Sequence, residues 1–375
     1  MSNMYAGLAR DLAGDSLQIK RCSGRLLEMR KSLADVRARK SDGSLLLATW
    51  NIRDFDSNKF GFGPRLPETF YYIAEIISCF DLVAVQEVNR DMSALEKVMR
   101  ILGREWQYIA TDVTEGPGGN QERMAFLYNR EKVWFRGVAS DVVLPDTQLV
   151  VTPKNAKKPG EAVSIETDAK QQFARSPFLV TFQSGWFRFS LSTVHIYYGS
   201  DSGAQLIRRI GEIKALVKFF ADRQDKEADL DRLGAVENYI LLGDFNVVSP
   251  QHETMKALKS ERFVVPDAID GDKVRKKGQH FYDQIAVRVK DKRFKVTGGG
   301  MVDIFKDVFR DGPEDMKEYE EHLPKKDPEE GEFAAKTPEA LYRKWRTWQM
   351  SDHSPLWVEI STDFADDYLT RLRGE

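Results

Sequence analysis

The chain has 375 residues, of which 42% are hydrophobic and 30% are charged, and its formal charge is −2 at pH 7. This composition allows a sizeable core in a soluble protein, and the length suits two or three average domains or one large α/β or β-sandwich enzyme. The near-neutral charge excludes a global electrostatic attraction to nucleic acid or to an anionic membrane. Any such partner must therefore contact a local patch.

Residues 5–40 are predicted to be helical, and the part from Lys20 to Lys40 carries eight Lys or Arg against two acids. Two interpretations of this basic helix remain open. It is either a solvated helix that docks through Leu26, Leu27 and Leu33, or an element that contacts a nucleic-acid backbone outside the active site.

Short apolar runs, which predict strands, alternate with helical patterns along the rest of the chain. Strands are expected at 45–52, 82–88, 123–129, 178–182, 187–196, 239–246, 285–289 and 354–360, and helices at 67–80, 92–102 and 204–220. The last helix is amphipathic, with Arg208, Arg209, Lys214 and Lys218 expected on its solvent face. Residues 154–172 and the acidic 311–335 are interpreted as insertions or mobile loops, and GGG at 298–300 as a turn.

The amino terminus lacks the apolar stretch of roughly 7–15 residues that a secretory signal needs, and no segment approaches the roughly 20 apolar residues of a membrane span. Cys22 and Cys79 have no metal-ligand spacing and are interpreted as free thiols. We therefore expect a cytoplasmic protein without a membrane span.

Polar side chains stand at the ends of several predicted strands. An isolated buried polar group costs roughly 1–3 kcal/mol unless it is paired, so one such residue could simply be a capped strand end. A whole set of carboxylate, carboxamide and imidazole groups is difficult to explain as independent caps. Hard oxygen ligands suit Mg²⁺, while asparagine and histidine can hold phosphate oxygens and transfer protons. The residues are Asn51, Glu87, His195, Asp244, Asn246, Asp283, Asp352 and His353.

These residues lie in motifs that resemble, in order, the signature motifs of the endonuclease/exonuclease/phosphatase superfamily, nearest to its deoxyribonuclease I branch. The motifs are TWNIR (49–53), QEV (86–88), STVHI (192–196), GDFN (243–246), YDQIAV (282–287) and SDHSPLWVEI (351–360), with QERMAFLYN (121–129) and FARSPFLVTF (173–182) as further matches. The resemblance covers about residues 45–360. It implies an α/β (α+β) fold, a four-layer α/β/β/α sandwich of two mostly antiparallel sheets face to face with flanking helices, and one active site at an edge of the sandwich.

The resemblance also implies a role for each site residue. The metal would be bound by Glu87, Asn51 and Asp352, and the substrate phosphate would contact Arg175 and Asn246. The catalytic group would comprise His195, Asp244, Asn246, Asp283, His353 and Glu122, in which Glu122 pairs with His195 and Asp283 with His353. Because these positions run through most of the chain, one catalytic domain is expected at 44–362, between a basic helical extension at 1–43 and a tail or helix at 363–375.

The function that follows is a Mg²⁺-dependent phosphodiester hydrolase, with Mn²⁺ as a substitute and nucleic acid as the expected substrate. The sequence indicates no protein partner. Two alternatives remain open: hydrolysis of a small or lipid-derived phosphate ester, and a catalytically silent scaffold. Deoxyribonuclease I has an arginine and a tyrosine that enter the DNA minor groove where this chain has Asn89 and Asn120, which argues against duplex DNA. Tyr342, Trp345 and Trp348 are expected either to pack in the core or to line the substrate cleft.

Overall fold

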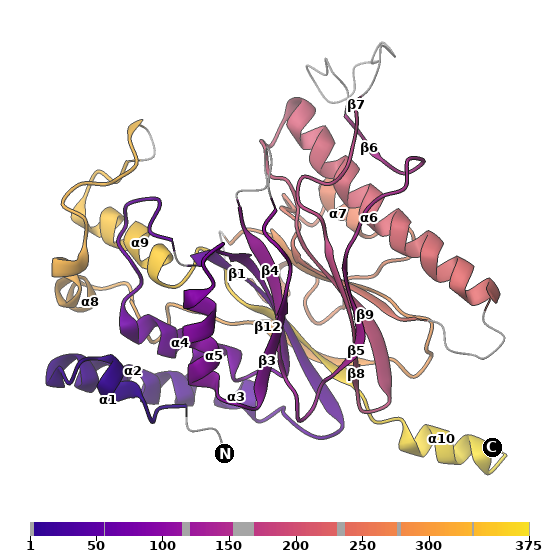
Figure 1. Cartoon of the computed structure of the whole chain (residues 1–375), viewed down its shortest axis with the longest axis horizontal. Coiled ribbons are helices and arrows are strands. Elements are labelled where there is room, and N and C mark those ends of the chain that lie inside the picture. The colour runs from indigo at the N-terminus through magenta and orange to yellow at the C-terminus, as the bar shows by residue number, and fades with distance from the viewer. Residues whose placement is uncertain are drawn as a thin grey trace.

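Two β-sheets lie face to face at the centre of the molecule, and helices cover their outer faces (Figure 1). The structure, a computed structural model, describes residues 4–55, 57–114, 121–152, 169–230, 237–275, 279–331 and 334–374. One sheet has the strand order β12–β13–β1–β2–β4–β3, and the other has the order β11–β10–β9–β8–β5. β1 and β2 are parallel, as are β9 and β10, while the other neighbouring strands are antiparallel. The predicted four-layer sandwich is confirmed.

The strands of the larger sheet are β1 (Ser44–Phe55), β2 (Leu82–Val88), β3 (Trp106–Ala110), β4 (Arg123–Asn129), β12 (Val296–Met301) and β13 (Leu356–Ser361). Those of the smaller sheet are β5 (Trp134–Asp141), β8 (Phe178–Ser184), β9 (Phe187–His195), β10 (Tyr239–Asp244) and β11 (Asp283–Arg288). A separate pair consists of β6 (Val150–Thr152) and β7 (Ala169–Gln171). The helices are α1 (Leu8–Asp11), α2 (Ser16–Ser32), α3 (Ala34–Arg37), α4 (Pro67–Ile77), α5 (Ser93–Leu102), α6 (Gly203–Leu230), α7 (Glu253–Leu258), α8 (Pro313–Glu318), α9 (Pro338–Gln349) and α10 (Ala365–Leu372), with short 3₁₀ turns η1 (Gly271–Lys273) and η2 (Glu320–His322).

The core forms because β1 is apolar on both of its faces. Leu45 and Leu47 belong to the hydrophobic cluster that includes the residues between the sheets, whereas Leu46 and Ala48 belong to the cluster shared with α4 and α5. Successive residues of a strand point to opposite faces, so this one strand contributes to both layers. Burial on both sides makes β1 a rigid support for the residues at its end.

The basic amino-terminal helix α2 packs on the α4 side of the sandwich through one face, on which Cys22, Leu26 and Met29 are buried, and its opposite face is exposed to solvent. Leu26 and Leu33 are buried as predicted, but Leu27 is 61% exposed, because it lies about 100° around the helix from Leu26. Its arginines contact acids elsewhere in the chain: Arg21 Nε lies 3.1 Å from Glu68 Oε2, and Arg25 Nη2 lies 2.7 Å from Asp315 Oδ1. Basic residues that follow α2 are also paired, since Arg37 contacts Glu75, Arg39 contacts Glu359 and Lys40 contacts Asp81.

The acidic segment 311–335 therefore has a basic partner within the chain. Its described part contains α8 and η2, and Asp315, near its start, is buried between Arg25 and Arg310. Most of the other segment interpreted as an insertion, 154–172, lies outside the described residues, and its end forms β7.

The predicted turn at 298–300 is wrong, because Gly298, Gly299 and Gly300 lie within β12 and pair with β13. A Cβ atom on Gly299 would lie 2.7 Å from Ile269 Cγ2, and one on Gly300 would lie 2.9 Å from Trp357 Nε1. The glycines thus permit close packing of an edge strand rather than a change of chain direction. In the part of the chain that the structure describes, no helix is both long and apolar enough to span a membrane.

Candidate active site

The strand register brings three predicted site residues together at one edge of the smaller sheet. Asp244, the last residue of β10, is directly opposite His195 of β9 on one side and Asp283 of β11 on the other. Asn51 reaches across from β1 of the larger sheet and donates a hydrogen bond from Nδ2 to Asp244 Oδ2 at 3.1 Å. These predicted site residues therefore lie together where the ends of the two sheets meet.

Two histidine–carboxylate pairs lie on either side of Asp244. His195 Nδ1 is 2.8 Å from Glu122 Oε1, and His353 Nδ1 is 2.7 Å from Asp283 Oδ2. Each imidazole turns its other nitrogen inwards, so that both Nε2 atoms lie 3.7 Å from Asp244 Oδ2. The arrangement leaves two Nε2 atoms facing one shared carboxylate, and both can exchange a proton with a group bound there.

The charges of these pairs decide the protonation of the histidines. Burial lowers the pKa of His353, but the carboxylates of Asp283 and Asp244 outweigh burial and raise this pKa well above its usual value. Burial also lowers the pKa of His195, as does Arg175, but the carboxylates of Glu122 and Asp244 together raise this pKa above its usual value. For Asp283 itself, burial raises the pKa, since the charge of His353 only partly offsets the loss of solvation.

Asp244 is held as an anion. Burial raises its pKa, but the positive charges of His353 and His195 and the hydrogen bonds from Asn246 and Asn51 together lower the pKa below its usual value. The backbone N–H of Asn246 donates to Asp244 Oδ1 at 2.9 Å, so one carboxylate oxygen is fixed from behind while the other faces the histidines. A buried carboxylate kept ionised in this way can orient a water molecule or accept its proton.

Arg175 is placed behind Glu122. Its guanidinium contacts the Glu122 carboxylate, and its Nη1 donates to the backbone oxygen of His195 at 3.3 Å. Burial raises the pKa of Glu122, but the charges of His195 and Arg175 lower it overall. With 7% of its surface exposed, Arg175 fixes the Glu122–His195 pair, and its contact with substrate phosphate stays a prediction.

Arg209 fixes the loop after β10. The amphipathic pattern of 204–220 predicted that this side chain lies on the solvent face of the helix. That prediction is wrong, because the Arg209 side chain is fully buried and donates to the backbone oxygens of Tyr198, Ser200 and Asn246. Asn246 has a left-handed backbone conformation, with φ of 50°, and its Nδ2 donates to the Ile196 oxygen at 2.7 Å. The buried guanidinium thus holds in place the turn that carries Asn246.

Glu87 lies at an irregularity of β2, and this feature directs its side chain toward the cleft. The register shifts between Val85 and Val88, and Glu87 has a φ of 60°, which is uncommon for a residue other than glycine. Glu87 Oε1 accepts a hydrogen bond from Asn51 Nδ2 at 2.9 Å, and Oε2 accepts one from the backbone N–H of Asp54 at 2.9 Å. Burial raises the pKa of Glu87, and the charges of Glu122 and Asp352 add to the rise while His195 opposes it.

The site contains a possible metal-binding group of acidic and histidine residues. Ligand atoms of Glu87, Glu122 and His195 lie within 4.8 Å of one another. Glu122 and His195 already contact each other, whereas Asn51 Oδ1 is buried with no hydrogen-bond partner among the described residues. A hard cation prefers oxygen ligands, so the buried Asn51 oxygen and the Glu87 carboxylate beside it suit such a cation. The His195 imidazole suits it less, because it already contacts Glu122. Asp352 is farther out, with 46% of its side chain exposed and its Oδ2 3.7 Å from Arg53 Nε.

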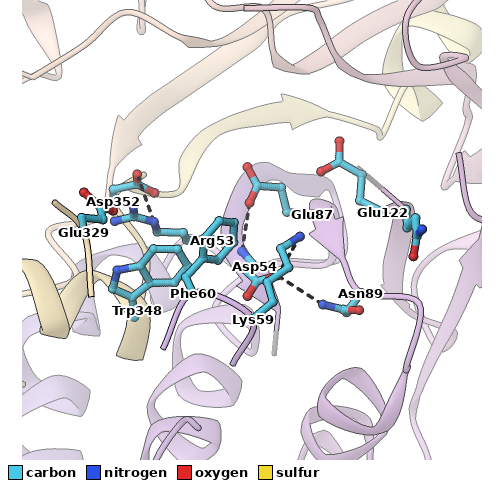
Figure 2. Close-up of a pocket in the computed structure, with 11 residues that line it drawn as sticks. Arg53, Asp54, Lys59, Phe60, Glu87, Asn89, Glu122, Glu329, Trp348 and Asp352 are labelled. Carbon is cyan, nitrogen blue, oxygen red and sulfur yellow. Dashed lines mark hydrogen bonds and ion pairs between the residues drawn. The ribbon is translucent and has the colours of Figure 1, made fainter. Parts of the chain in front are cut away.

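A cleft of about 890 Å³ opens beside Glu87 and Glu122 (Figure 2). Its lining includes residues that the sequence did not indicate, namely Arg53, Asp54, Lys59, Phe60 and Glu329. Asn89 also lines it and donates to Asp54 Oδ1 at 3.2 Å, whereas Asn120 lies outside the described residues. Of the three aromatic residues left open between core and cleft, all belong to the hydrophobic core, and Trp348 also borders the cleft.

No protein-family model and no curated protein matches the chain. Solved structures of similar fold include an endonuclease/exonuclease/phosphatase family protein from Bacteroides thetaiotaomicron, with 19% identity, a TM-score of 0.47, and coverage of 86% of this chain and 96% of that one. In sequence motifs and in fold, the chain resembles the endonuclease/exonuclease/phosphatase superfamily.

Two further neighbours carry names from different substrate classes. The mannosyl-6-phosphatase of Bacteroides thetaiotaomicron has 18% identity and a TM-score of 0.46, with 84% of this chain and 99% of that chain covered. TDP2 from D. rerio, complexed with a single-strand DNA product, has 10% identity and a TM-score of 0.46, with 85% and 99% covered. Similarity at this level concerns the fold and assigns no substrate.

Proposed function

We propose that the protein is a Mg²⁺-dependent phosphodiesterase of the endonuclease/exonuclease/phosphatase superfamily that hydrolyses nucleic acid. The observation that carries this proposal is the position of Asp244 Oδ2, 3.7 Å from Nε2 of both His195 and His353, each of which has its own carboxylate partner. Two proton-transfer groups around one ionised carboxylate suit a displacement that must activate a water molecule and protonate a leaving oxygen.

Glu87 and Asn51 are the residues that would bind the cation, with Asp352 across the cleft. When bound, Mg²⁺ supplies electrostatic stabilisation of the negative charge that develops on the phosphate oxygens. The nearby carboxamide of Asn246 and the pair formed by Arg175 and Glu122 position polar groups on the same edge of the sandwich. The hard oxygen donors at Glu87 and Asn51 favour Mg²⁺, with Mn²⁺ as a substitute.

The chain's own residues then divide the proton transfers. Asp244, whose lowered pKa keeps it ionised, orients the attacking water through the oxygen that faces the histidines. A histidine with a raised pKa is protonated near neutral pH and donates from Nε2 to the leaving oxygen, while its carboxylate partner keeps the ring in orientation. Both Nε2 atoms lie 3.7 Å from Asp244 Oδ2, so Asp244 accepts the proton that the attacking water loses, and either imidazole can donate a proton to a leaving oxygen bound beside this carboxylate.

The proposal is tested by hydrolysis assays with and without Mg²⁺. Substrates would be single-stranded DNA, single-stranded RNA, plasmid DNA, bis-p-nitrophenyl phosphate and p-nitrophenyl phosphate, with His353→Ala purified in parallel as a control for contaminating nucleases. We expect diester hydrolysis that is lost in EDTA, restored by Mg²⁺ or Mn²⁺, and absent from the variant. Hydrolysis of the monoester alone would favour the small-phosphate alternative, and inactivity on every substrate would contradict the proposal.

A further inference from the structure

One wall of the cleft is a stack of aromatic and cationic side chains (Figure 2). The Arg53 guanidinium carbon lies 3.7 Å from the centroid of the Trp348 ring, and Phe62 stacks on Trp348 with centroids 5.0 Å apart and planes 12° from parallel. Phe60 contacts the same indole, with centroids 4.6 Å apart, and Lys59 Nζ lies 5.0 Å from the Phe60 centroid. Figure 2 shows the Phe60 ring between Trp348 and Lys59.

Trp348 supports this wall, and Phe60 presents it to the cleft. Trp348 is only 7% exposed, whereas Phe60, in the loop after β1, is 44% exposed. The Phe60 ring is held on one side by the indole, and the flexible side chain of Lys59 lies on the other, so part of the ring surface faces the cleft while the ring has low conformational freedom. It is therefore suited to stack with a planar ring of a ligand.

Each acidic side chain of the wall lies close to a basic side chain, which reduces its repulsion of a negatively charged ligand. Asp54 Oδ1 lies 3.4 Å from Lys59 Nζ, and Glu329 Oε2 lies 2.5 Å from Lys344 Nζ. Asp352 is similarly adjacent to Arg53. Each of these carboxylates has a cation close to it, although Lys344 is shared with Asp327, whose Oδ2 lies 2.9 Å from Lys344 Nζ.

A second group of planar side chains lies next to the catalytic cluster but belongs to the other sheet. Tyr282, directly before Asp283, has its ring 5.9 Å from the His353 ring and 6.1 Å from the Tyr198 ring. His280 is exposed and stacks on Tyr282 with centroids 4.4 Å apart and planes 5° from parallel. Phe60 follows a strand of the larger sheet, whereas Tyr198 and Tyr282 adjoin β9 and β11 of the smaller one. Planar groups thus adjoin the catalytic residues from both sheets.

We propose that these two groups bind unpaired nucleobases on the two sides of the scissile phosphate, so that the substrate class is single-stranded nucleic acid. This inference rests on the proposed phosphodiesterase function and narrows its substrate. Aromatic side chains stack on any base whose face is free, and such stacking tolerates sequence changes. In a duplex, the faces of the bases are occupied by neighbouring base pairs, and a side chain in the cleft has no free face to contact.

The test separates binding from hydrolysis by working in EDTA. A fluorescently labelled single-stranded pentanucleotide is compared, by anisotropy titration, with a strand of equal length and charge that carries abasic sugars at every position. We expect the strand with bases to bind about five- to 150-fold more tightly for each base that stacks. Phe60→Ala and Tyr198→Ala should each reduce the ratio of the two affinities by at least about fivefold, and Phe60→Trp should retain the ratio of the unaltered protein. Neither Ala variant should change the affinity for the abasic strand.

The matched control is Trp134→Ala, which removes a side chain that is 52% exposed on β5, away from the cleft lining. It should leave both affinities unchanged. Equal affinity for the two strands, an equal loss for both strands in Phe60→Ala, or tighter binding of the corresponding duplex would each overturn the inference. The outcome is distinct from failure of the proposed function, which appears as absence of diester hydrolysis by the unaltered protein in Mg²⁺.

Discussion

Asn51 donates its Nδ2 hydrogen bond to Asp244 Oδ2 across the junction of the two sheets, at 3.1 Å. The same amide nitrogen lies 2.9 Å from Glu87 Oε1, so one side chain links the carboxylate proposed to act on water with the carboxylate proposed to bind the cation. Beneath this contact, Gln86 Nε2 donates to Thr193 Oγ1 at 2.7 Å and to Thr49 Oγ1 at 3.1 Å. The two halves of the site are thereby fixed relative to one another by polar contacts between sheets.

Asp244→Asn tests the central carboxylate with almost no change of shape. We expect kcat for bis-p-nitrophenyl phosphate to fall at least about 100-fold, because a neutral amide can neither accept the proton of water nor balance two histidines. The far-ultraviolet circular dichroism spectrum should be retained. Asp272→Asn, at an exposed position, is the control and should keep full activity. Near-normal turnover by the Asp244 variant would exclude the mechanism.

Glu87→Gln tests the cation site. Replacement of an anionic ligand by a neutral amide should weaken Mg²⁺ binding at least about tenfold, as measured by isothermal titration calorimetry. Glu329→Gln is a matched control, because Glu329 lines the same cleft but its carboxylate contacts Lys344. Unchanged affinity in Glu87→Gln, or an equal loss in both variants, would place the cation elsewhere.

The site residues at strand ends were predictable because each directly follows or precedes a run of apolar residues in the sequence. Asp244 ends the fully buried strand β10, and Asn51 follows the buried apolar run at the start of β1, so this abrupt change from apolar to polar is visible in the sequence. Which of these ends meet depends on strand order. The resemblance implied one active site at an edge of the sandwich, but neither it nor the local pattern gave the order of the strands.

Contacts between distant parts of the chain were not predictable from local patterns. Arg25 and Asp315 are separated by 290 positions, so the basic helix and the acidic segment seemed to be independent features. Arg209 was assigned to solvent by helical periodicity, yet its guanidinium satisfies backbone carbonyls of loops that lie next to the helix only in the folded chain. Phe60 lies in a loop without periodicity, and nothing in its sequence context indicates a cleft.

Arg25→Ala tests whether the basic helix stabilises the fold or contacts a polyanion. Asp315 is 1% exposed, and loss of one of its two arginine partners should lower the free energy of unfolding by about 1–3 kcal/mol in urea titrations. Arg10→Ala, which truncates a 75% exposed side chain, should change it by less than about 0.5 kcal/mol. If Arg25→Ala leaves stability unchanged but flattens the salt dependence of oligonucleotide binding, the helix acts on the ligand instead.

The two cysteines provide a test of packing beneath α2 and α4, because both thiols are buried and free. Burial raises the pKa of Cys22 to about 12 and that of Cys79 to about 11. Only the thiolate reacts with Ellman's reagent, so the native protein should show almost no reaction near pH 8, whereas protein in guanidinium chloride should release one equivalent of the coloured product for each of the two cysteines.

The folded-state pKa values of the two thiols exceed the unfolded value of about 8.5. The contribution of the two buried thiols to the free energy of unfolding is therefore complete below about pH 8.5 and is lost as the pH rises towards the folded values. Rapid labelling of the native protein near pH 8 would contradict this packing if sub-denaturing urea did not change its rate. It would show that Cys22 of α2 or Cys79 after α4 is not buried as the structure has it.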